Sequence, residues 1–158
     1  MDGSRVNAAA VKAVWLTYSR DLLVEYAFGA ENDPANPFGR VILTVLGNGD
    51  AAVNQYRHGS HRQFSGRAVR QTIDWILELL NAASFPLVAD HAIPPGATRS
   101  VRVVLGGRSL QTQEIAYHVP PTMPAYQLLF KLLDELITTA SDHALPIVAA
   151  PRAGLLAD

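Results

Sequence analysis

The stretch that most constrains the fold is GRVILTVLGNGDAAVNQYRHGSHRQFSG, residues 39–66, in which two short glycine-containing turns separate three strand-like runs. Turns of this kind join antiparallel neighbours, and the Gly-Asn-Gly-Asp of residues 47–50 tolerates the positive φ angles that they require. The run before that turn is apolar on both faces, which favours a central strand or one covered on both sides. The stretch therefore predicts three consecutive antiparallel strands.

The second turn, in HGSH, is assigned to Gly59 and Ser60, because glycine suits the first central position of a two-residue turn. In that register His58 opposes His61 across the strand pair, and Tyr56 shares their face. Two facing imidazoles can share a metal ion, but a stable site needs a third ligand. Nothing in the sequence ties another ligand to this turn, so we expect no metal and no cofactor.

Two arginines lie on the opposite face of the same predicted hairpin, together with Phe64. In the assigned register Arg57 opposes Arg62, and like charges directly opposite each other are unfavourable. A carboxylate of the chain or an anionic group of a partner would relieve this repulsion. Because arginine and aromatic side chains are enriched at protein interfaces, the hairpin tip is predicted to contact a protein partner. The alternative is a solvated edge of the sheet.

The rest of the chain predicts two more hairpins and two helices. One hairpin joins residues 11–20 to 22–28 through a turn at 19–21, and the other spans 101–119. Residues 66–83 and 124–140 have helical spacing, with Thr122 as the N-cap of the second helix. The predicted buried stripes are Val69, Ile73, Ile76, Leu77 and Leu80 in the first helix and Tyr126, Leu129, Phe130, Leu133, Leu136 and Ile137 in the second.

Each run of strands is followed by a helix, which argues against the alternating pattern of a parallel sheet. We predict an α+β fold, an antiparallel sheet of about five or six strands with two helices packed on one face. A single domain over residues 1–158 is expected, because this length suffices for one core. Residues 1–10 are expected to be a loose leader, and residues 141–158 an extended or mobile tail.

Composition excludes several classes of protein. Hydrophobic residues make up 49% and charged residues 17% of the chain, which is too apolar for a disordered protein. The 13 basic and 14 acidic residues give no basic excess of the kind that nucleic-acid binding favours. The absence of cysteine excludes disulfides and cysteine nucleophiles. Without a long apolar run or a convincing signal peptide, we expect a cytoplasmic protein with no membrane partner.

A second predicted contact surface is Glu31 to Phe38, within the loop GAENDPANPFG of residues 29–39, where Glu31 and Asp33 could meet a basic partner. No nucleophile elbow, phosphate loop, dinucleotide fingerprint or zinc-protease motif appears, so catalysis is not favoured. The alternative site is Asp90 beside His91, a pair found in many catalytic arrangements that also need a third group in space.

The order GRVILTVLGNGD, RQFSG, IDWILELLNAASFP, VRVVLGGRSLQ and LLFKLLDELI resembles the layout of small single-domain bacterial immunity proteins and proteinaceous inhibitors that sit beside toxins or proteases. The resemblance covers about residues 12–140. It is one of layout and hydrophobic pattern, without a diagnostic motif, and it transfers no functional residue. The chain departs from many immunity proteins, which are acidic, by its formal net charge of −1.

Together these observations predict a non-catalytic protein-binding domain, possibly an immunity or inhibitor protein that blocks a cognate toxin or enzyme. One alternative is a small-ligand or catalytic domain with a site near Asp90 and His91. Another is a self-associating subunit that exposes Trp75, Leu79 or the C-terminal tail. The predicted partner-binding residues are Arg57, Arg62, Phe64, Tyr56, His58, His61, Glu31 and Asp33.

Overall fold

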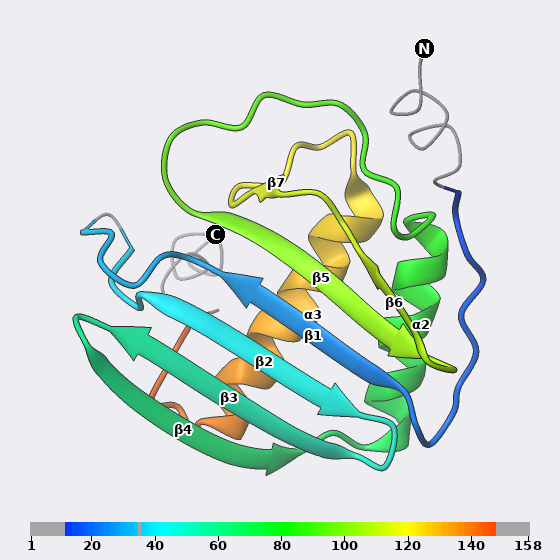
Figure 1. Cartoon of the computed structure of the whole chain (residues 1–158), viewed down its shortest axis with the longest axis horizontal. Coiled ribbons are helices and arrows are strands. Elements are labelled where there is room, and N and C mark those ends of the chain that lie inside the picture. Colours follow the sequence, from blue (N-terminus) through cyan, green and yellow to red (C-terminus); the bar gives the residue numbers. More distant parts are fainter. Residues whose placement is uncertain (1–11, 35, 148–158) are drawn as a thin grey trace, which may run out of the picture.

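A computed structural model describes residues 12–34 and 36–147, and within these ranges it contains a seven-stranded antiparallel sheet with two helices on one face (Figure 1). The predicted α+β class is therefore confirmed, and the sheet includes one two-residue strand beyond the expected five or six. The strands are β1 (Leu23–Phe28), β2 (Arg40–Leu46), β3 (Asp50–Arg57), β4 (Ser60–Arg67), β5 (Thr98–Leu105), β6 (Arg108–Gln111) and β7 (Ile115–Ala116). The helices are α2 (Arg70–Ala82) and α3 (Pro124–Ala140).

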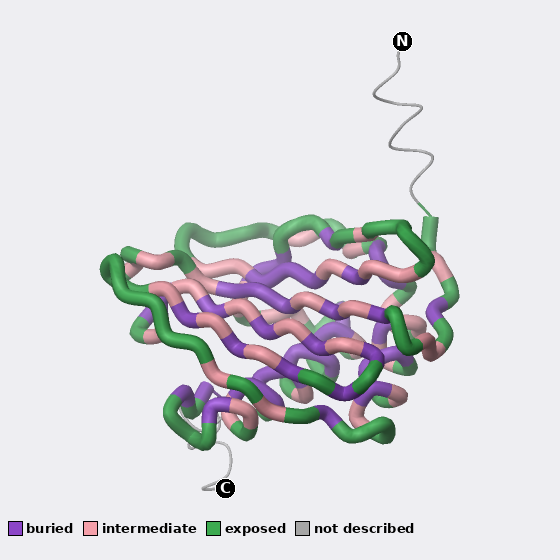
Figure 2. The backbone as a smooth tube through the Cα atoms, turned by 60° about the horizontal axis from the view of Figure 1, so that its bottom comes forward, coloured by how far each residue is buried: buried purple, intermediate pink, exposed green. Residues whose placement is uncertain are grey.

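The strand order is β4-β3-β2-β1-β5-β6, with β7 paired to β5. This order confirms that β2 is a central strand, with β1 and β3 as its neighbours. Buried and half-buried positions alternate along β2 (Figure 2). The buried set faces the helices, and the half-buried set lies on the opposite, open face of the sheet. The alternation follows from the two-residue period of a strand with only one covered face.

The first predicted hairpin is wrong in its first half. Residues 22–28 contribute β1, but residues 12–19 form no strand. The amide of Asn81, near the end of α2, instead donates to the carbonyl of Leu16 at 2.9 Å and accepts from its N–H at 2.8 Å. The Asn81 side chain thus gives the backbone of Leu16 the hydrogen bonds that a neighbouring strand would otherwise have made. The predicted leader, residues 1–10, lies outside the described residues.

The predicted helix interiors are confirmed, whereas the predicted start of α2 and the predicted cap of α3 are wrong. The buried stripe of α3 is confirmed in full, and α3 spans the predicted residues. Val69 is wrong as a member of the first stripe, because it is the extended N-cap of α2 and is 66% exposed. Thr122 is wrong as a cap, because Met123 occupies that position without a side-chain hydrogen bond.

The predicted extended or mobile tail is packed as far as the structure describes it. Leu145 is 2% exposed and Ile147 is fully buried, and both belong to the main hydrophobic core. The hydroxyl of Thr138 on α3 donates to the carbonyl of Leu145 at 3.1 Å, which fixes the turn after the helix. Residues 148–158 lie outside the described residues.

A buried polar cluster joins the sheet to α3. Nη1 of Arg99 on β5 donates to Oδ2 of Asp134 on α3 at 3.0 Å, and both side chains are about nine-tenths buried. The hydroxyl of Tyr26 on β1 donates to Oδ1 of the same carboxylate at 2.7 Å. The Arg99 side chain also donates through Nε to the carbonyl of Tyr117 at 2.7 Å. A buried charge that is paired and hydrogen-bonded in this way is tolerated, whereas an unpaired one is costly.

No helix within residues 12–34 and 36–147 combines the length and the hydropathy needed to cross a membrane.

The ion pair gives a stability prediction. Asp134→Ala leaves the Arg99 guanidinium buried without its partner and is expected to lower the free energy of unfolding by about 3–5 kcal/mol. Lys131→Ala, which removes an exposed charge from the same helix, is the control and should change it by less than about 0.5 kcal/mol. The double variant Arg99→Met with Asp134→Leu should be more stable than Asp134→Ala alone. Urea denaturation measures all three, and equal losses for Asp134→Ala and Lys131→Ala would contradict the assignment.

The buried tyrosines give a pH prediction. Burial, with the charge of Asp134, raises the pKa of Tyr26 well above its ordinary value, and burial also raises the pKa of Tyr126. Because the folded chain holds these protons more tightly than the unfolded chain, their stabilisation is complete below the unfolded pKa of about 10. It is lost as the pH rises from there toward the folded pKa values.

Urea denaturation between pH 8 and pH 11 should therefore show a falling free energy of unfolding above about pH 10. In Tyr126→Phe the fall should be shallower, by up to about 1.4 kcal/mol per pH unit, because one titrating group has been removed. If the free energy of unfolding fell as steeply with pH in Tyr126→Phe as in the wild type, folding would not raise the pKa of this phenol.

Candidate functional site

The predicted register of the β3–β4 hairpin is wrong. The two central residues of its turn are His58 and Gly59, with φ angles of 50° and 81°, and the next residue already belongs to β4. A two-residue turn with both φ angles positive matches the right-handed twist of the strands, and it outweighs the cost of a left-handed histidine. Neither the two histidines nor the two arginines therefore oppose each other. The observed pairs at this end are Tyr56–His61, Arg57–Ser60 and Gln55–Arg62.

In the observed register each residue of β3 has a different partner on β4 than predicted, but its side chain lies on the predicted face of the sheet. The partner of each strand residue moves by two positions, which preserves the alternation of side chains. Arg57, Arg62 and Phe64 lie on the helix side of the sheet, as the pairing of Phe64 with the buried Val53 shows. His58 belongs to the turn and to neither face. The predicted repulsion between opposed arginines is removed, because Arg57 now lies across from Ser60.

The side chains at the hairpin tip form local pairs. The guanidinium carbon of Arg62 lies 4.9 Å from the ring centroid of Phe64. The rings of Tyr56 and His61 stack at 4.6 Å with an interplanar angle of 3°. Nε2 of His61 is also 2.8 Å from Oδ1 of Asn54, within hydrogen-bond distance. The tip therefore presents two exposed arginines and a stacked aromatic pair, while Phe64 is half-buried and packs against the core.

In the structure, the loop of residues 29–39 contacts the turn of the β3–β4 hairpin. The Glu31 carboxylate accepts a hydrogen bond from the N–H of Gly59 at 2.8 Å, and its carbonyl accepts one from the N–H of His58 at 3.4 Å. Further along the loop of residues 29–39, the carbonyl of Phe38 accepts from the buried amide of Gln55 at 2.8 Å. The loop is thus held against the hairpin at two points. We call the eight predicted partner-binding residues the tip surface. Tyr56 and His61 lie on the open face of the sheet at this end, and Arg57, Arg62 and Phe64 lie on the helix side.

At the alternative site of Asp90 and His91, the imidazole of His91 makes hydrogen bonds to the backbone. Nδ1 of His91 lies 2.9 Å from the carbonyl of Ala89, and Nε2 lies 3.0 Å from the N–H of Ala116 on β7. A carbonyl can only accept and an N–H can only donate, so His91 is the neutral tautomer with its proton on Nδ1. Because both ring nitrogens bind backbone, the imidazole ties residues 84–97 to β7. Asp90 is exposed beside it.

The residues of the predicted self-association surface are only partly exposed. Trp75 on α2 is 48% exposed, whereas Leu79 is half-buried and packs against the core. In the described part of the tail, Leu145 and Ile147 are buried. Of the residues described at these three places, Trp75 therefore supplies most of the exposed apolar surface.

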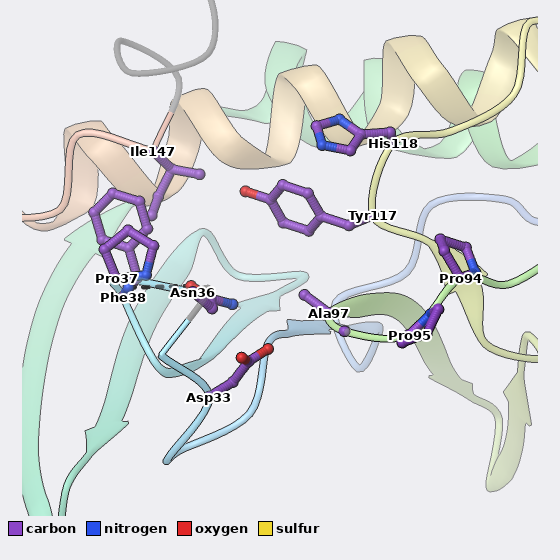
Figure 3. A pocket seen from close by; sticks show the side chains of 11 residues that line it. Asp33, Asn36, Pro37, Phe38, Pro94, Pro95, Ala97, Tyr117, His118 and Ile147 are labelled. Atoms are coloured by element: carbon purple, nitrogen blue, oxygen red, sulfur yellow. Dashed lines mark hydrogen bonds between the residues drawn. The ribbon is translucent and has the colours of Figure 1, made fainter.

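A cavity of about 440 Å³ lies beside the tip surface and shares the loop of residues 29–39 with it (Figure 3). Its other walls come from residues 94–97, from the two residues after β7, and from the segment after α3. We call it the loop cavity. It is lined by Asp33, Asn36, Pro37, Phe38, Pro94, Pro95, Gly96, Ala97, Tyr117, His118 and Ile147.

Asn36 lines the loop cavity and carries a buried hydrogen-bond donor without a partner. Its side chain is 7% exposed, and its Oδ1 accepts from the N–H of Phe38 at 3.1 Å, which fixes the orientation of the amide. Within residues 12–34 and 36–147, its Nδ2 is the one buried side-chain polar atom that lacks a hydrogen-bond partner. This nitrogen is closed off from solvent and lies beside Gly29, where an added Cβ would come within 2.3 Å of it. Buried donors without a partner are rare, because the lost hydrogen bond is costly.

Tyr117 is the polar group on the opposite wall, and the buried ion pair positions it. Its ring centroid lies 4.0 Å from the guanidinium carbon of Arg99, which also donates to its carbonyl. Figure 3 shows its hydroxyl directed across the cavity toward Ile147. Burial raises the pKa of the Tyr117 phenol, so it remains protonated at neutral pH and can donate a hydrogen bond.

The loop cavity therefore combines apolar walls with the hydroxyl of Tyr117, and with Asp33 and His118 also in its lining. Within residues 12–34 and 36–147, no three histidine, aspartate or glutamate side chains lie close enough together to hold a metal ion. The arrangement is suited to binding an uncharged group that has both apolar surface and a hydrogen-bond acceptor.

Asp33 was predicted from the sequence as part of a contact surface, whereas Asn36, Tyr117 and His118 were not predicted as site residues. The signal available for Asn36 was its position two residues before Phe38 in a loop, where asparagine accepts from its own backbone two residues on. Nothing in the sequence indicates that the three residues meet. Comparison adds no candidate, since no family model and no curated protein matches the chain.

The contact between loop and hairpin gives a testable prediction. Glu31→Ala removes the acceptor for the Gly59 N–H and should speed amide exchange at Gly59 about twofold to tenfold, as expected for the loss of one exposed hydrogen bond. The overall free energy of unfolding should change by less than about 1 kcal/mol. Glu78→Ala, an exposed substitution on α2, serves as control. Hydrogen exchange followed by NMR measures both, and unchanged exchange at Gly59 would contradict the contact.

Proposed function

We propose that the chain is a non-catalytic protein-binding domain and that the tip surface contacts its partner. The observation that carries the proposal is the Glu31–Gly59 hydrogen bond, because it joins the loop of residues 29–39 and the hairpin tip into one surface. A surface that is ordered before binding loses less conformational entropy when a partner docks. This favours recognition by the whole end of the sheet over two independent contacts.

The chemistry of the tip surface supports a protein partner. Arg57 and Arg62 are exposed, and the half-buried Phe64 shares their face of the sheet. The stacked pair of Tyr56 and His61 lies on the other face at the same end. Arginine and aromatic residues are enriched at interfaces and supply much of their binding energy. The exposed guanidinium groups favour a partner that presents carboxylates. Binding of this kind would act by steric obstruction if the contacted region of the partner were its active site, as in an inhibitor or immunity protein.

The neutral tautomer of His91 weighs against the alternative catalytic function. A general base needs a ring nitrogen that can reach the proton of a substrate. Both nitrogens of this imidazole are engaged with backbone groups. We therefore assign His91 to the folding of residues 84–97 and not to chemistry.

Charge reversal at the tip tests the proposed function. Arg57→Glu with Arg62→Glu should weaken binding of the partner, once captured from the native host and purified, by about tenfold or more, because two favourable charge contacts become repulsive. The thermal midpoint should stay within about 2 °C, since both side chains are exposed. Arg108→Glu, an exposed arginine in the β5–β6 hairpin, is the matched control.

Calorimetric titration of the partner against the three proteins decides the outcome. Equal affinity for wild type and the double variant would remove the tip surface as the binding site. An equal loss in Arg108→Glu would show that the effect is one of overall charge and not of position.

A further inference from the structure

We propose that the protein partner adds a strand to the free edge of the sheet, pairing an extended segment antiparallel with β4 and placing a carboxylate beside Arg62. The inference rests on the proposed function, because it assumes a protein partner that docks at the hairpin end of the sheet. It specifies how that partner is held, by backbone hydrogen bonds along one strand and by one charge contact.

The two edges of the sheet, β4 and β6, differ in how they are protected (Figure 1). β6 has four residues, and β7 pairs with a further part of β5 beyond it. β4 has eight residues, pairs with β3 at every one of them without a bulge, and contains neither proline nor lysine. Short strands, bulges, proline and lysine are the usual protections of a sheet edge against pairing with another chain. β4 lacks these protections, and its two arginines are its only charged residues.

The backbone of β4 offers a row of hydrogen-bonding groups to an added strand. The N–H of Ala68 donates to the carbonyl of Gly49 at 2.7 Å, and this pair continues the register of β3 and β4. Because bonded and non-bonded pairs alternate in an antiparallel ladder, the even-numbered residues of β4 bond to β3. The N–H and C=O groups of His61, Gln63 and Ser65 therefore point to the free edge, and we call these N–H groups the outward amides. In the described part of the chain, no turn or loop bonds to the backbone of these three residues.

A strand added at this edge contacts the tip surface from both faces of the sheet. Arg62 and Phe64 lie on the helix side, whereas His61 stacks on Tyr56 on the open face. A partner that lay flat on one face would reach only one of these two groups. The side chains of an added strand alternate between the faces, so they lie beside both groups. Strand addition is therefore the mode in which a single element of the partner contacts the whole hairpin end.

The charge of β4 favours an acidic partner segment over a second copy of this chain. Residues 60–67 contain two arginines and no acidic residue, and Asp50 of β3 pairs with Arg67 at 2.7 Å. Within residues 12–34 and 36–147, no ion pair engages Arg62. Two β4 strands paired with each other would place no carboxylate opposite Arg62 and would bring their positive charges together. An acidic strand supplies the missing negative charge.

The position of Arg62 sets the pattern of the partner segment. Because the backbone of Arg62 bonds to β3, the partner residue opposite it belongs to a pair without backbone hydrogen bonds, in which side chains approach more closely. A carboxylate at that position lies within reach of the guanidinium. Phe64 is the next residue on the same face, so the partner residue two positions before the carboxylate is apolar. The expected pattern is an apolar residue, any residue, and then aspartate or glutamate.

Amide exchange of the full-length chain without its partner, followed by NMR, tests the free edge first. The outward amides should exchange about tenfold or more faster than the amides of Arg62 and Phe64, because only the latter two are bonded to β3. Equally slow exchange in both sets would overturn the proposal. It would show that the edge is already covered, by another part of this chain or by a second copy of it.

The partner, captured from the native host and purified, tests the added strand itself. Its binding should slow exchange at the outward amides by about tenfold or more, since each gains a backbone hydrogen bond. Gln63→Pro removes one outward donor and leaves the bonds to β3 in place, whereas Gln63→Ala keeps that donor. In calorimetric titrations Gln63→Pro should bind the partner about tenfold more weakly than Gln63→Ala. Ser65→Pro and Ser65→Ala repeat the comparison should Gln63→Pro fail to fold.

Failure of the added strand can be told apart from failure of the proposed function. Unchanged exchange at the outward amides in the complex, or equal affinities of the proline and alanine variants, would overturn strand addition. If Arg57→Glu with Arg62→Glu still weakens the partner in that case, the proposed function stands and only the mode of binding fails. Undiminished affinity of this charge-reversed variant, with the outward amides unprotected, would remove the proposed function as well.

Discussion

The ion pair of Arg99 and Asp134 is the interaction on which the rest of the structure depends. It lies between β5 and α3, nine-tenths buried, and Tyr26 completes the hydrogen bonding of its carboxylate. Apolar packing alone would hold α3 against the sheet in many closely similar positions. Two buried charges allow far fewer, since any displacement that separates them leaves each without a partner. The pair thereby fixes where the helix lies on the sheet, and with it the segments that follow β7 and α3.

The candidate site inherits its geometry from this pair. The Arg99 guanidinium lies under the ring of Tyr117 and binds its carbonyl, so the wall of the loop cavity is held by the same side chain that orients α3. Ile147, on another wall, follows the turn that Thr138 fixes at the end of that helix. The loop of residues 29–39 is held independently, through Glu31 and Gly59 at one end and Phe38 and Gln55 at the other. The site is therefore assembled from parts of the fold that are separately stabilised.

Local patterns in the sequence predicted the elements, whereas contacts between distant residues could not be predicted. The span of α3 follows from one apolar stripe and from Pro124 in its first turn, and both lie within the segment itself. The register of the β3–β4 hairpin was missed because two adjacent turn positions are chemically acceptable, and the structure places a histidine in the left-handed region beside Gly59. Arg99 and Asp134 are 35 residues apart, and no spacing rule indicates that they meet. For the same reason the sequence identified the loop but not the cavity that the loop lines.

Hydrogen exchange of the chain in complex with its purified partner, read out by mass spectrometry, tests the central claim most directly. The account predicts slower exchange on binding in residues 29–39 and 56–62, the loop and the hairpin tip that it contacts. Exchange in α2 and in the β5–β6 hairpin should stay unchanged. Protection confined to α2, or to the open face of the sheet, would contradict the assignment of this end of the molecule as the partner-binding surface.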